Sequence, residues 1–429
     1  MLLMFTGCNK TKTLLDKNNP VTLSLWHVYG EQSNSPFNKL IEEFNHTVGL
    51  DKGIIINVTN VTDAVKVGDE LIKSFNHMPD SLSIPDIFFC HKNNAKNIGI
   101  ENLINFKDHF TQTELSDFLP DFLSDGIIDE KLVIFPVSKS THLLFINGSR
   151  FNKFSLDTGV SLESLKTWEG YFAASRKYYE WSGGLPFSAI DYPIRDIELQ
   201  TMKYDSSFKT NNDWYDFNNL NFKNTFKYFM QNVIKGNVVI SDKFFNTQIM
   251  TGEVASGIGS SAAILYCNDT VTYPDNTKEK TNLIVLPLPK TPNFKNYVTQ
   301  AGVGLCAHKT TKQKEEAIIL FTKWLTEAKR NLEFVSEMGY MPVRRGAFDE
   351  IKNFKFYDKG YENLYKALLE TKETSIFVRE NEDKDYFIKV QKFYAKLKAN
   401  QKAYNERYKN GEDIEILLKE CFDLLKSVG

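Results

Sequence analysis

The chain has 429 residues, of which 42% are hydrophobic and 25% charged, and its formal net charge at pH 7 is −2. This composition is typical of a folded globular protein and excludes wholesale disorder, and the near-neutral charge gives no basic field that would indicate nucleic-acid binding. At roughly 150 residues per domain, the length predicts two or three domains.

The first eight residues, Met-Leu-Leu-Met-Phe-Thr-Gly-Cys, form a short apolar run that ends in a cysteine. The pattern resembles a bacterial lipoprotein signal, in which Cys8 would become the lipidated first residue of an exported protein. The run is shorter than the roughly 7 to 15 apolar residues of a usual signal. An upstream start and an incidental cysteine therefore stay open as alternatives. No apolar run of 18 or more residues follows, so we expect any membrane attachment to come through Cys8.

The first 90 residues alternate between strand-like and helix-like patterns. Strict alternation or β-branched residues predict strands, whereas apolar residues at i, i+3, i+4 and i+7 after Ser35-Pro36 predict a helix. The predicted elements in chain order are a strand at 21–25, a helix at 36–44, a strand at 54–61, a helix at 67–75 and a strand at 86–90. Strand, helix, strand, helix, strand is the pattern of a parallel sheet with right-handed crossovers.

The rest of the chain predicts more helix than strand. Strands are expected at 132–135, 143–147 and 283–288, and a polar surface loop at 205–221. Helices are expected after Ser161, from Thr311 through Trp324 towards Gly339, and as a pair from 383 onward. The chain shows no internal repeat and no long low-complexity linker.

One segment, Gly257-Ile-Gly259-Ser-Ser-Ala262, has the spacing of a dinucleotide fingerprint. That fingerprint requires an apolar strand directly before it, and the preceding residues offer at most a very short one. The segment is therefore weak evidence for a nucleotide. A second interpretation is a helix start that presents Ser260 and Ser261 to a hydroxyl group or an anion, and a capped helix facing water is as plausible.

Cysteines and histidines give no sign of a metal site, a disulfide scaffold or a catalytic centre. Besides Cys8 the chain has four scattered cysteines, Cys90, Cys267, Cys306 and Cys421. Buried thiols are the favoured interpretation, with one long-range disulfide left open. No two of the seven histidines have metal-ligand spacing, and His27 and His91 are expected to be structural or ligand-facing.

Several segments together resemble one family, the extracellular solute-binding proteins of carbohydrate-type ABC importers, which includes maltose-binding and glycerol-3-phosphate-binding proteins. The matching segments follow one another in the family's order and cover nearly the whole chain. They are the strand and helix opening at 23–45, Pro85-Asp-Ile-Phe-Phe, the crossing at 131–147, Thr251-Gly-Glu-Val-Ala with Gly259-Ser-Ser-Ala262, and Met338-Gly-Tyr-Met-Pro-Val-Arg344.

The resemblance implies an α/β, two-lobed periplasmic-binding-protein-like fold of type II, in which discontinuous lobes are joined by hinge crossings. Residues 1–19 would be a signal remnant and tether, 20–138 with 286–322 lobe 1, and 139–285 with 323–429 lobe 2. It also implies a monomer with no catalytic residue, cofactor or metal, held by a lipid anchor at the outer face of the cytoplasmic membrane. The protein would capture a sugar or glycerol-phosphate-type solute and meet an ABC permease.

Carried over to this sequence, the resemblance places ligand contacts at seven residues: Ser140, Ser260, Ser261, Gly302, Gly304, Tyr340 and Arg379. Two departures matter. After the Pro85-Asp-Ile strand, where glycerol-3-phosphate binders place a carboxylate, this chain has Cys90-His91-Lys92, and the tyrosine expected near 61–66 is missing. The ligand could therefore be another phosphodiester, a sugar or an oligosaccharide.

Two other functions stay open at this point. An exported enzyme acting on glycans or phosphoesters would need a pair of acids about the scissile bond or a metal cluster, and the sequence shows neither convincingly. A ligand-sensing lipoprotein would share the fold and the ligand site, and would differ only in its membrane partner.

Overall fold

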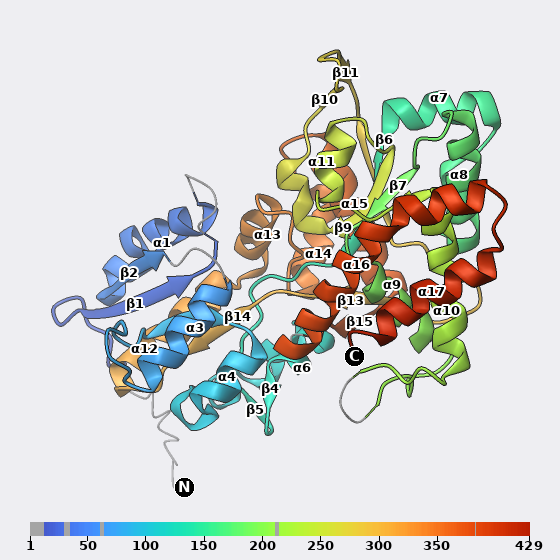
Figure 1. Ribbon diagram of the computed structural model, residues 1–429. Coiled ribbons are helices and arrows are strands. Elements are labelled where there is room, and N and C mark those ends of the chain that lie inside the picture. Colours follow the sequence, from blue (N-terminus) through green and yellow to red (C-terminus); the bar gives the residue numbers. More distant parts are fainter. Residues whose placement is uncertain (1–12, 30–34, 61–63, 211–213, 382) are drawn as a thin grey trace, which may run out of the picture. The chain divides into compact units, whose positions relative to one another are not determined.

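The computed structural model describes residues 13–29, 35–60, 64–210, 214–381 and 383–429 (Figure 1). The predicted lipidation residue Cys8 lies outside them. The chain divides into two compact units, unit 1 with Met1–Val137 and Val303–Phe334, and unit 2 with Ser138–Gly302 and Val335–Gly429. It passes from one unit to the other three times. The lobe boundaries expected from the sequence stay a prediction.

Unit 1 is built on a four-stranded sheet in the order β14-β3-β1-β2. Its strands are β1 (Val21–His27), β2 (Ile54–Asn60), β3 (Ile87–Cys90) and β14 (Gly304–Ala307). β1 pairs in parallel with both β2 and β3, as the alternating pattern predicts, and β14 adds to β3 in the antiparallel direction. All four residues of β3 are buried, which is typical of a parallel strand covered on both faces.

Neighbouring phenylalanines of β3 serve the two faces of this sheet. Because successive strand residues point to opposite sides, Phe88 meets Phe75 at the end of α3 (Ala64–Phe75), with ring centroids 5.9 Å apart. Phe89 instead packs edge-on against Phe37 of α1 (Pro36–His46) at 5.3 Å. Pro36 stands at the first turn of α1, where its missing N–H costs nothing.

The remaining elements of unit 1 are short, except for one long helix that packs against β1, α12 (Lys312–Leu325). Thr311 caps this helix with its side chain, as the sequence predicts. The third passage between units lies inside α13 (Ala328–Ser336). The other elements are α2 (Val48–Lys52), α4 (Lys92–Ile98), α5 (Gln112–Ser116), α6 (Pro120–Asp125), β4 (Ile127–Ile128) and β5 (Lys131–Leu132).

Unit 2 contains a five-stranded sheet in the order β12-β6-β9-β7-β8. Its strands are β6 (His142–Asn147), β7 (Ser188–Ile190), β8 (Val238–Val239), β9 (Ser256–Ser260) and β12 (Leu283–Pro287). β7 runs parallel to β8 and β9, whereas β6 is antiparallel to both β9 and β12. Two further pairs are β13 (Tyr297–Gln300) with β15 (Ile376–Arg379) and β10 (Thr270–Thr272) with β11 (Lys278–Lys280).

The Gly257-x-Gly259 segment is the body of the central strand β9, so the glycines do not form a nucleotide-binding loop. Phe245, which is fully buried at the start of α11 (Phe245–Met250), lies directly on them. A Cβ atom on Gly257 would come within 2.5 Å of the Phe245 Cβ, and one on Gly259 within 2.6 Å of its ring. The glycines are therefore explained by the close approach of a helix to the sheet.

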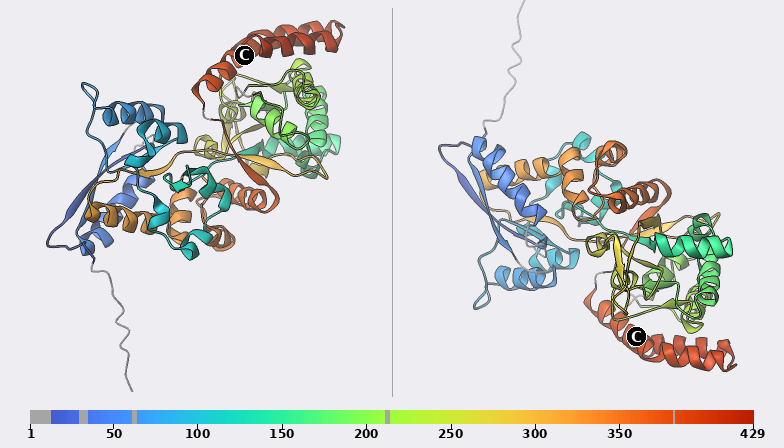
Figure 2. Two further views of the ribbon diagram at one scale, coloured as in Figure 1. Left: turned by 90° about the horizontal axis from the view of Figure 1, so that it is seen from below. Right: turned by 90° about the horizontal axis from the view of Figure 1, so that it is seen from above.

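Nine α-helices among the described residues lie wholly in unit 2, and the last two of them run along one side of it (Figure 2). The α-helix that the sequence predicts after Ser161 begins later, because Ser161 caps a 3₁₀ turn and Thr167 caps α8. The helices are α7 (Gly148–Thr158), α8 (Trp168–Trp181), α9 (Pro193–Met202), α10 (Leu220–Ile234), α11, α14 (Arg345–Glu350), α15 (Lys359–Thr374), α16 (Lys384–Lys409) and α17 (Ile414–Lys426).

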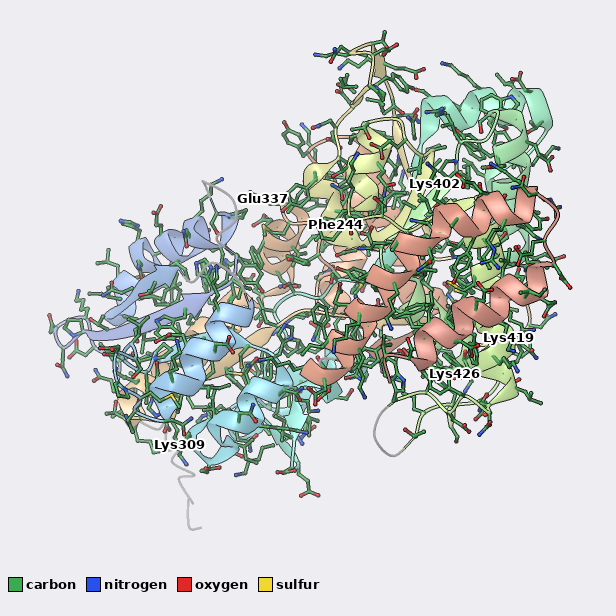
Figure 3. All side chains as sticks on the ribbon, in the orientation of Figure 1. Phe244, Lys309, Glu337, Lys402, Lys419 and Lys426 are labelled. Carbon is green, nitrogen blue, oxygen red and sulfur yellow. The ribbon has the colours of Figure 1, made fainter. Side chains whose placement is uncertain are left out.

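The C-terminal pair of helices is confirmed, and it packs against α10. Phe422 of α17 meets Phe226 of α10 edge-on, with ring centroids 5.1 Å apart. Lysines such as Lys402, Lys419 and Lys426 cover the exposed faces of the pair (Figure 3). Within the described residues, no helix combines the length and the apolar character that a membrane span requires.

The four cysteines of the described chain are all thiols. Cys90 and Cys306 lie on neighbouring strands of unit 1 with their sulfurs 3.5 Å apart, and both are fully buried. The strand register pairs Cys90 with Gly304 and Cys306 with Phe88, so the two cysteines are diagonal neighbours.

We predict that Gly257→Ala lowers the free energy of unfolding by about 1–3 kcal/mol, because the new methyl group overpacks the Phe245 contact. Urea denaturation measures the change. Gly360→Ala is the matched control, since the nearest atom to its added Cβ is a side-chain oxygen at 3.2 Å and its backbone is helical. Equal stability of the two variants would contradict the packing explanation.

Candidate functional site

One edge of the unit 2 sheet gathers the ends of three strands. β7 and β9 are parallel, so their carboxyl ends at Ile190 and Ser260 lie at the same edge, and antiparallel β6 brings its amino end at His142 there. We call this the carboxyl edge of unit 2 and define it by residues 138–142, 191–192 and 259–262. In open α/β sheets, ligands bind outside the carboxyl ends of the strands.

Backbone pairing fixes the segment that enters this edge from unit 1. Ser140 and Ala301 exchange two hydrogen bonds of 3.0 Å, each donating its N–H to the other's carbonyl oxygen. One residue earlier, the Lys139 N–H donates to the Met341 carbonyl at 3.3 Å and the Met341 N–H donates back at 2.6 Å. Segments more than 150 residues apart in sequence thereby meet at the carboxyl edge.

Ser260 and Ser261 lie at the end of β9. The Ser261 N–H donates to the Thr141 carbonyl at 2.8 Å, and the Ser260 hydroxyl accepts a 3.3 Å hydrogen bond from the Ala262 N–H. The Ser261 side chain is fully buried, and its hydroxyl has no hydrogen-bond partner among the described residues. Ser260 is half-buried, so its side chain is the more accessible of the two.

Arg379 joins the same region through the small parallel pair of β13 and β15. It lies opposite Gln300, one residue before the Ala301 that pairs with Ser140. The next residue, Glu380, donates its N–H to the Gln300 carbonyl at 3.3 Å. Arg379 and Glu380 therefore sit at the end of β15, next to the segment that enters the carboxyl edge.

Gly302 and Tyr340 flank these pairings. Gly302 has a positive φ of 115°, and an added Cβ would meet only the Ser138 carbonyl at 3.7 Å, so backbone conformation and not space calls for glycine. Tyr340 is half-buried and precedes Met341, while its own carbonyl accepts a 2.6 Å hydrogen bond from the Tyr365 hydroxyl. The structure thus brings six of the seven predicted contact residues together within unit 2.

The seventh residue, Gly304, lies in unit 1 at the start of β14, opposite Cys90. A Cβ atom there would come within 2.9 Å of the Phe135 carbonyl oxygen and would also collide with the side chain of Ile134. Close packing explains this glycine without a ligand. Its place in unit 1 is also at the carboxyl edge of a sheet, where β1 and β3 end.

Sequence reasoning missed a group of charged side chains beside His142. The His142 ring has Asp196 on one side, with Nδ1 and Oδ1 3.7 Å apart, and Glu380 on the other, with Nε2 and Oε1 3.9 Å apart. Arg195 forms an ion pair with Glu380 at 3.0 Å. Asp196 is fully buried, and burial raises the pKa of its carboxyl group.

Asp191 and Tyr192 continue this group at the end of β7. The Asp191 carboxylate accepts a 2.8 Å hydrogen bond from the Phe245 N–H, yet burial raises its pKa to about 6. The guanidinium of Arg195 lies 4.3 Å from the centre of the Tyr192 ring. Carboxylates, an arginine and an aromatic face are suited to a solute with hydroxyl groups, because carboxylates accept hydrogen bonds from them and rings pack on apolar faces.

A sequence signal for these residues exists, although it is faint. Ala189 and Ile190 are apolar, and Asp191-Tyr-Pro follows them with an acid and a helix-starting proline. An acid directly after a buried strand is a candidate for a ligand site. This strand has only two apolar residues and no strong alternation. Its pattern is therefore too short to identify it as a strand.

His27 is structural. It is fully buried, its Nε2 lies 2.8 Å from the Asn38 amide oxygen, and its Nδ1 accepts the Tyr29 N–H at 3.0 Å. Burial lowers the pKa of His27. In the part of the chain that the structure describes, no group of three or more potential ligands is placed to hold a metal ion.

The chain matches the family model of a bacterial extracellular solute-binding protein over residues 39–359. No curated protein matches it. Among solved structures it is similar to the cyclic alpha-maltosyl-1,6-maltose binding protein from Arthrobacter globiformis, with a TM-score of 0.70 and 15% identity over 96% of this chain and 99% of that one.

Two other solved structures show the same fold. UgpB from Mycobacterium tuberculosis in complex with glycerophosphocholine has a TM-score of 0.65 and 14% identity, with 96% of this chain and 98% of that one covered. A probable secreted solute-binding lipoprotein from Streptomyces coelicolor has a TM-score of 0.69 and 15% identity over 96% and 98%. The fold predicted from the sequence, α/β and two-lobed of the periplasmic-binding-protein type, is confirmed by these similarities.

We predict that Asp191→Asn stabilises the ligand-free protein at pH 7–8. The pKa of about 6 lies above the usual 3.8, so ionised Asp191 costs stability above pH 6, and this cost disappears as the pH falls towards 4. The difference between the two pKa values corresponds to at most about 3 kcal/mol. The free energy of unfolding in urea, measured from pH 4 to pH 8, gives the result.

Asp205→Asn is the control with the opposite sign, because a hydrogen bond from the Ser207 N–H lowers the pKa of Asp205. That variant should lose stability at pH 7. An Asp191→Asn curve that runs parallel to wild type from pH 4 to pH 8 would show that Asp191 titrates normally.

Proposed function

The chain belongs to the bacterial extracellular solute-binding proteins, and from this premise we propose that it captures a hydroxyl-rich, sugar-type solute for an ABC importer. The family is extracellular, and the relatives of known structure are binding proteins. The observation that supports the proposal best is the meeting of polar, charged and aromatic residues at the carboxyl edge of unit 2.

In this proposal the solute contacts the seven residues that the family resemblance indicates, Ser140, Ser260, Ser261, Gly302, Gly304, Tyr340 and Arg379. Ser260 offers a hydroxyl group, and Gly302 leaves room beside the backbone. We add Asp191, Tyr192 and Glu380 as acceptors and ring surface. Hydrogen bonds to charged groups contribute about 1.5–3 kcal/mol each, so a few of them give useful affinity.

The charges favour a neutral sugar over a phosphate. Asp191 and Glu380 are both acids near the end of β9, and Glu380 already holds Arg195 in an ion pair. A phosphate would meet these carboxylates and gain little from the paired arginine. Arg379 is the residue through which a phosphodiester would still bind, and the relatives include proteins solved with either class of ligand.

Capture requires selective affinity and a reversible change of shape. A micromolar dissociation constant corresponds to about −8 kcal/mol. We propose that the solute favours a closed form of the protein by its differential affinity for that form. A membrane permease would then receive the closed form, and lipidation at Cys8 would keep the protein at the outer face of the membrane.

We predict that neutral oligosaccharides of the maltose type raise the melting temperature of the protein. A ligand at 100 times its dissociation constant stabilises by about 2.7 kcal/mol. Glycerol phosphates and glycerophosphodiesters form the comparison set in the same thermal-shift screen. Stabilisation by the phosphodiesters alone would overturn the preference for sugars. If neither set raises the melting temperature of a protein that melts cooperatively, the proposed class of solute is wrong.

We predict that Tyr340→Ala weakens binding of the stabilising solute at least tenfold, and that a Ser260→Ala/Ser261→Ala double variant weakens it measurably, while both variants stay folded. Calorimetric titration gives the dissociation constants. Tyr357→Ala is the matched control, since Tyr357 is 92% exposed. Unchanged binding in both site variants would show that the solute binds elsewhere.

The lipid anchor has its own test. The native protein should partition into the membrane fraction, and Cys8→Ser should release it into the soluble fraction. A membrane-bound Cys8→Ser variant would contradict lipidation at this residue.

A further inference from the structure

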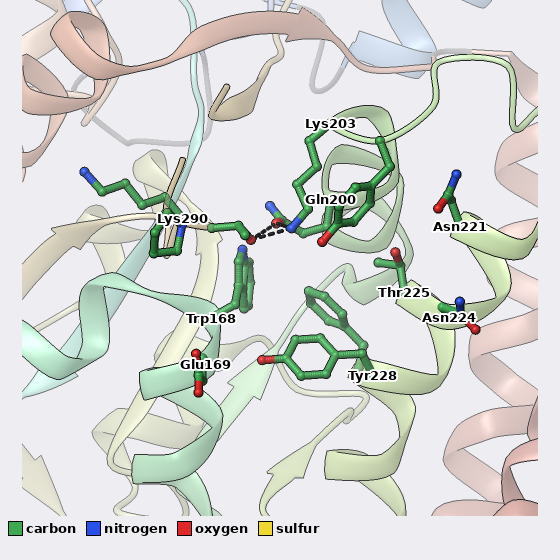
Figure 4. A pocket seen from close by; sticks show the side chains of 13 residues that line it. Trp168, Glu169, Gln200, Lys203, Asn221, Asn224, Thr225, Tyr228 and Lys290 are labelled. Carbon is green, nitrogen blue, oxygen red and sulfur yellow. Dashed lines mark hydrogen bonds between the residues drawn. The ribbon is translucent and has the colours of Figure 1, made fainter. Parts of the chain in front are cut away.

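Unit 2 contains a pocket of about 550 Å³ (Figure 4), and none of the residues that define the carboxyl edge lines it. The ends of three helices and one loop form it: the start of α8, the end of α9, the start of α10 and residues 290–292. All of these belong to unit 2. None of the residues predicted to contact the transported solute lines it.

Lys203 at the end of α9 brings a positive charge to this pocket. Its ammonium group donates a 2.9 Å hydrogen bond to the Gln200 side-chain oxygen and a second bond to the Thr291 hydroxyl. It also lies 4.7 Å from the centre of the Tyr204 ring. Both hydrogen-bond acceptors are neutral. Two of the three N–H groups of Lys203 are therefore hydrogen-bonded, but its positive charge is not neutralised.

No carboxylate of the described residues compensates Lys203. Burial alone lowers its pKa to about 8, and no nearby acid offsets that effect. A half-buried cation without a counter-charge is unfavourable, and an anion placed beside it removes part of the cost. The ammonium group also lies 5.6 Å from the centre of the Phe294 ring.

Aromatic side chains form the opposite wall. Trp168 and Phe229 are almost fully buried and pack with ring centroids 4.7 Å apart, and the Tyr228 hydroxyl extends below Trp168 (Figure 4). Burial raises the pKa of Tyr228 to about 12, so this hydroxyl stays a neutral donor. The indole N–H of Trp168 is buried and has no acceptor among the described residues. In Figure 4 it points towards the Lys203 hydrogen bonds.

Neutral polar groups complete the pocket from α10. Thr225, Asn221 and Asn224 line it opposite Trp168 (Figure 4). Amide and hydroxyl groups both donate and accept hydrogen bonds, so they match ring hydroxyls. Glu169 and Lys290 also line the pocket, so its charged groups are two cations and one carboxylate. The pocket combines these charges with an aromatic wall and groups that pair with hydroxyls.

We propose that this pocket is a second ligand site, which binds a small monoanion with a hydroxylated ring, such as a hexuronate sugar. The carboxylate lies on Lys203, the ring lies against Tyr228 beside the buried Trp168, and the ring hydroxyls face the amides of α10. A neutral hexose fits the same walls and leaves the Lys203 charge uncompensated, so it binds more weakly. The site is independent of the solute proposed for the carboxyl edge.

Glucuronate and glucose are the probes, titrated into the intact protein and followed by the NMR signals of the tryptophan indole groups. We expect glucuronate to shift the Trp168 signal, assigned through Trp168→Phe, at a concentration at least tenfold below that needed for glucose. Lys203→Met should remove this preference. Lys223→Met is the matched control, because Lys223 is exposed on α10 and does not line the pocket.

A second measurement on the wild-type protein covers the case in which Lys203→Met does not fold. Glucuronate should slow the modification of Lys203 by an amine-reactive reagent at least threefold and leave Lys223 unaffected, as mass spectrometry of peptides reports. Equal effects of glucuronate and glucose, or equal loss in both lysine variants, would overturn the proposal. Tyr340→Ala should bind glucuronate normally, so failure of one site is distinguished from failure of the other.

Discussion

The pairing of residues 139–141 with distant segments of the chain is the constraint on which unit 2 depends. This segment arrives from the other unit without a helix or sheet of its own, and it becomes buried. Buried backbone groups need hydrogen-bond partners. Ala301, Met341 and Ser261 supply them. The same bonds that satisfy the segment also set the positions of β6, β9 and the chain around 340, and so they assemble the carboxyl edge.

The burial of carboxyl groups at that edge lowers the stability of the protein. Asp196 is fully buried, neither of its carboxylate oxygens has a hydrogen-bond partner among the described residues, and Asp191 keeps its charge only above about pH 6. A core made for stability would place apolar residues there. Groups that are costly in the unliganded state are those that gain most when a solute supplies new hydrogen bonds, so local departures from good packing indicate where binding takes place.

Local patterns were enough to predict much of the fold. The alternation at 21–25, Pro36 with its apolar stripe, and the amphipathic pair of tail helices from 383 each follow from short-range rules, and the structure contains all three. The residues of the site were harder to predict from the sequence. His142, Asp196 and Glu380 are far apart in sequence, and the packing of β6, α9 and the end of β15 brings them together. The two glycines of β9 look like a nucleotide motif until the packing of Phe245 explains them.

Unit 1 is unfinished when its first 137 residues have been made. β14, the outer partner of β3, and α12, which packs on β1, are encoded after Gly302, and all of Ser138–Gly302 comes between. Unit 2 likewise requires α15 and the two tail helices from the last part of the chain. Domains usually fold one after another during synthesis. Here unit 1 waits for the segment that ends at Phe334 and unit 2 for the tail helices, so neither unit can complete its fold from its first segment alone.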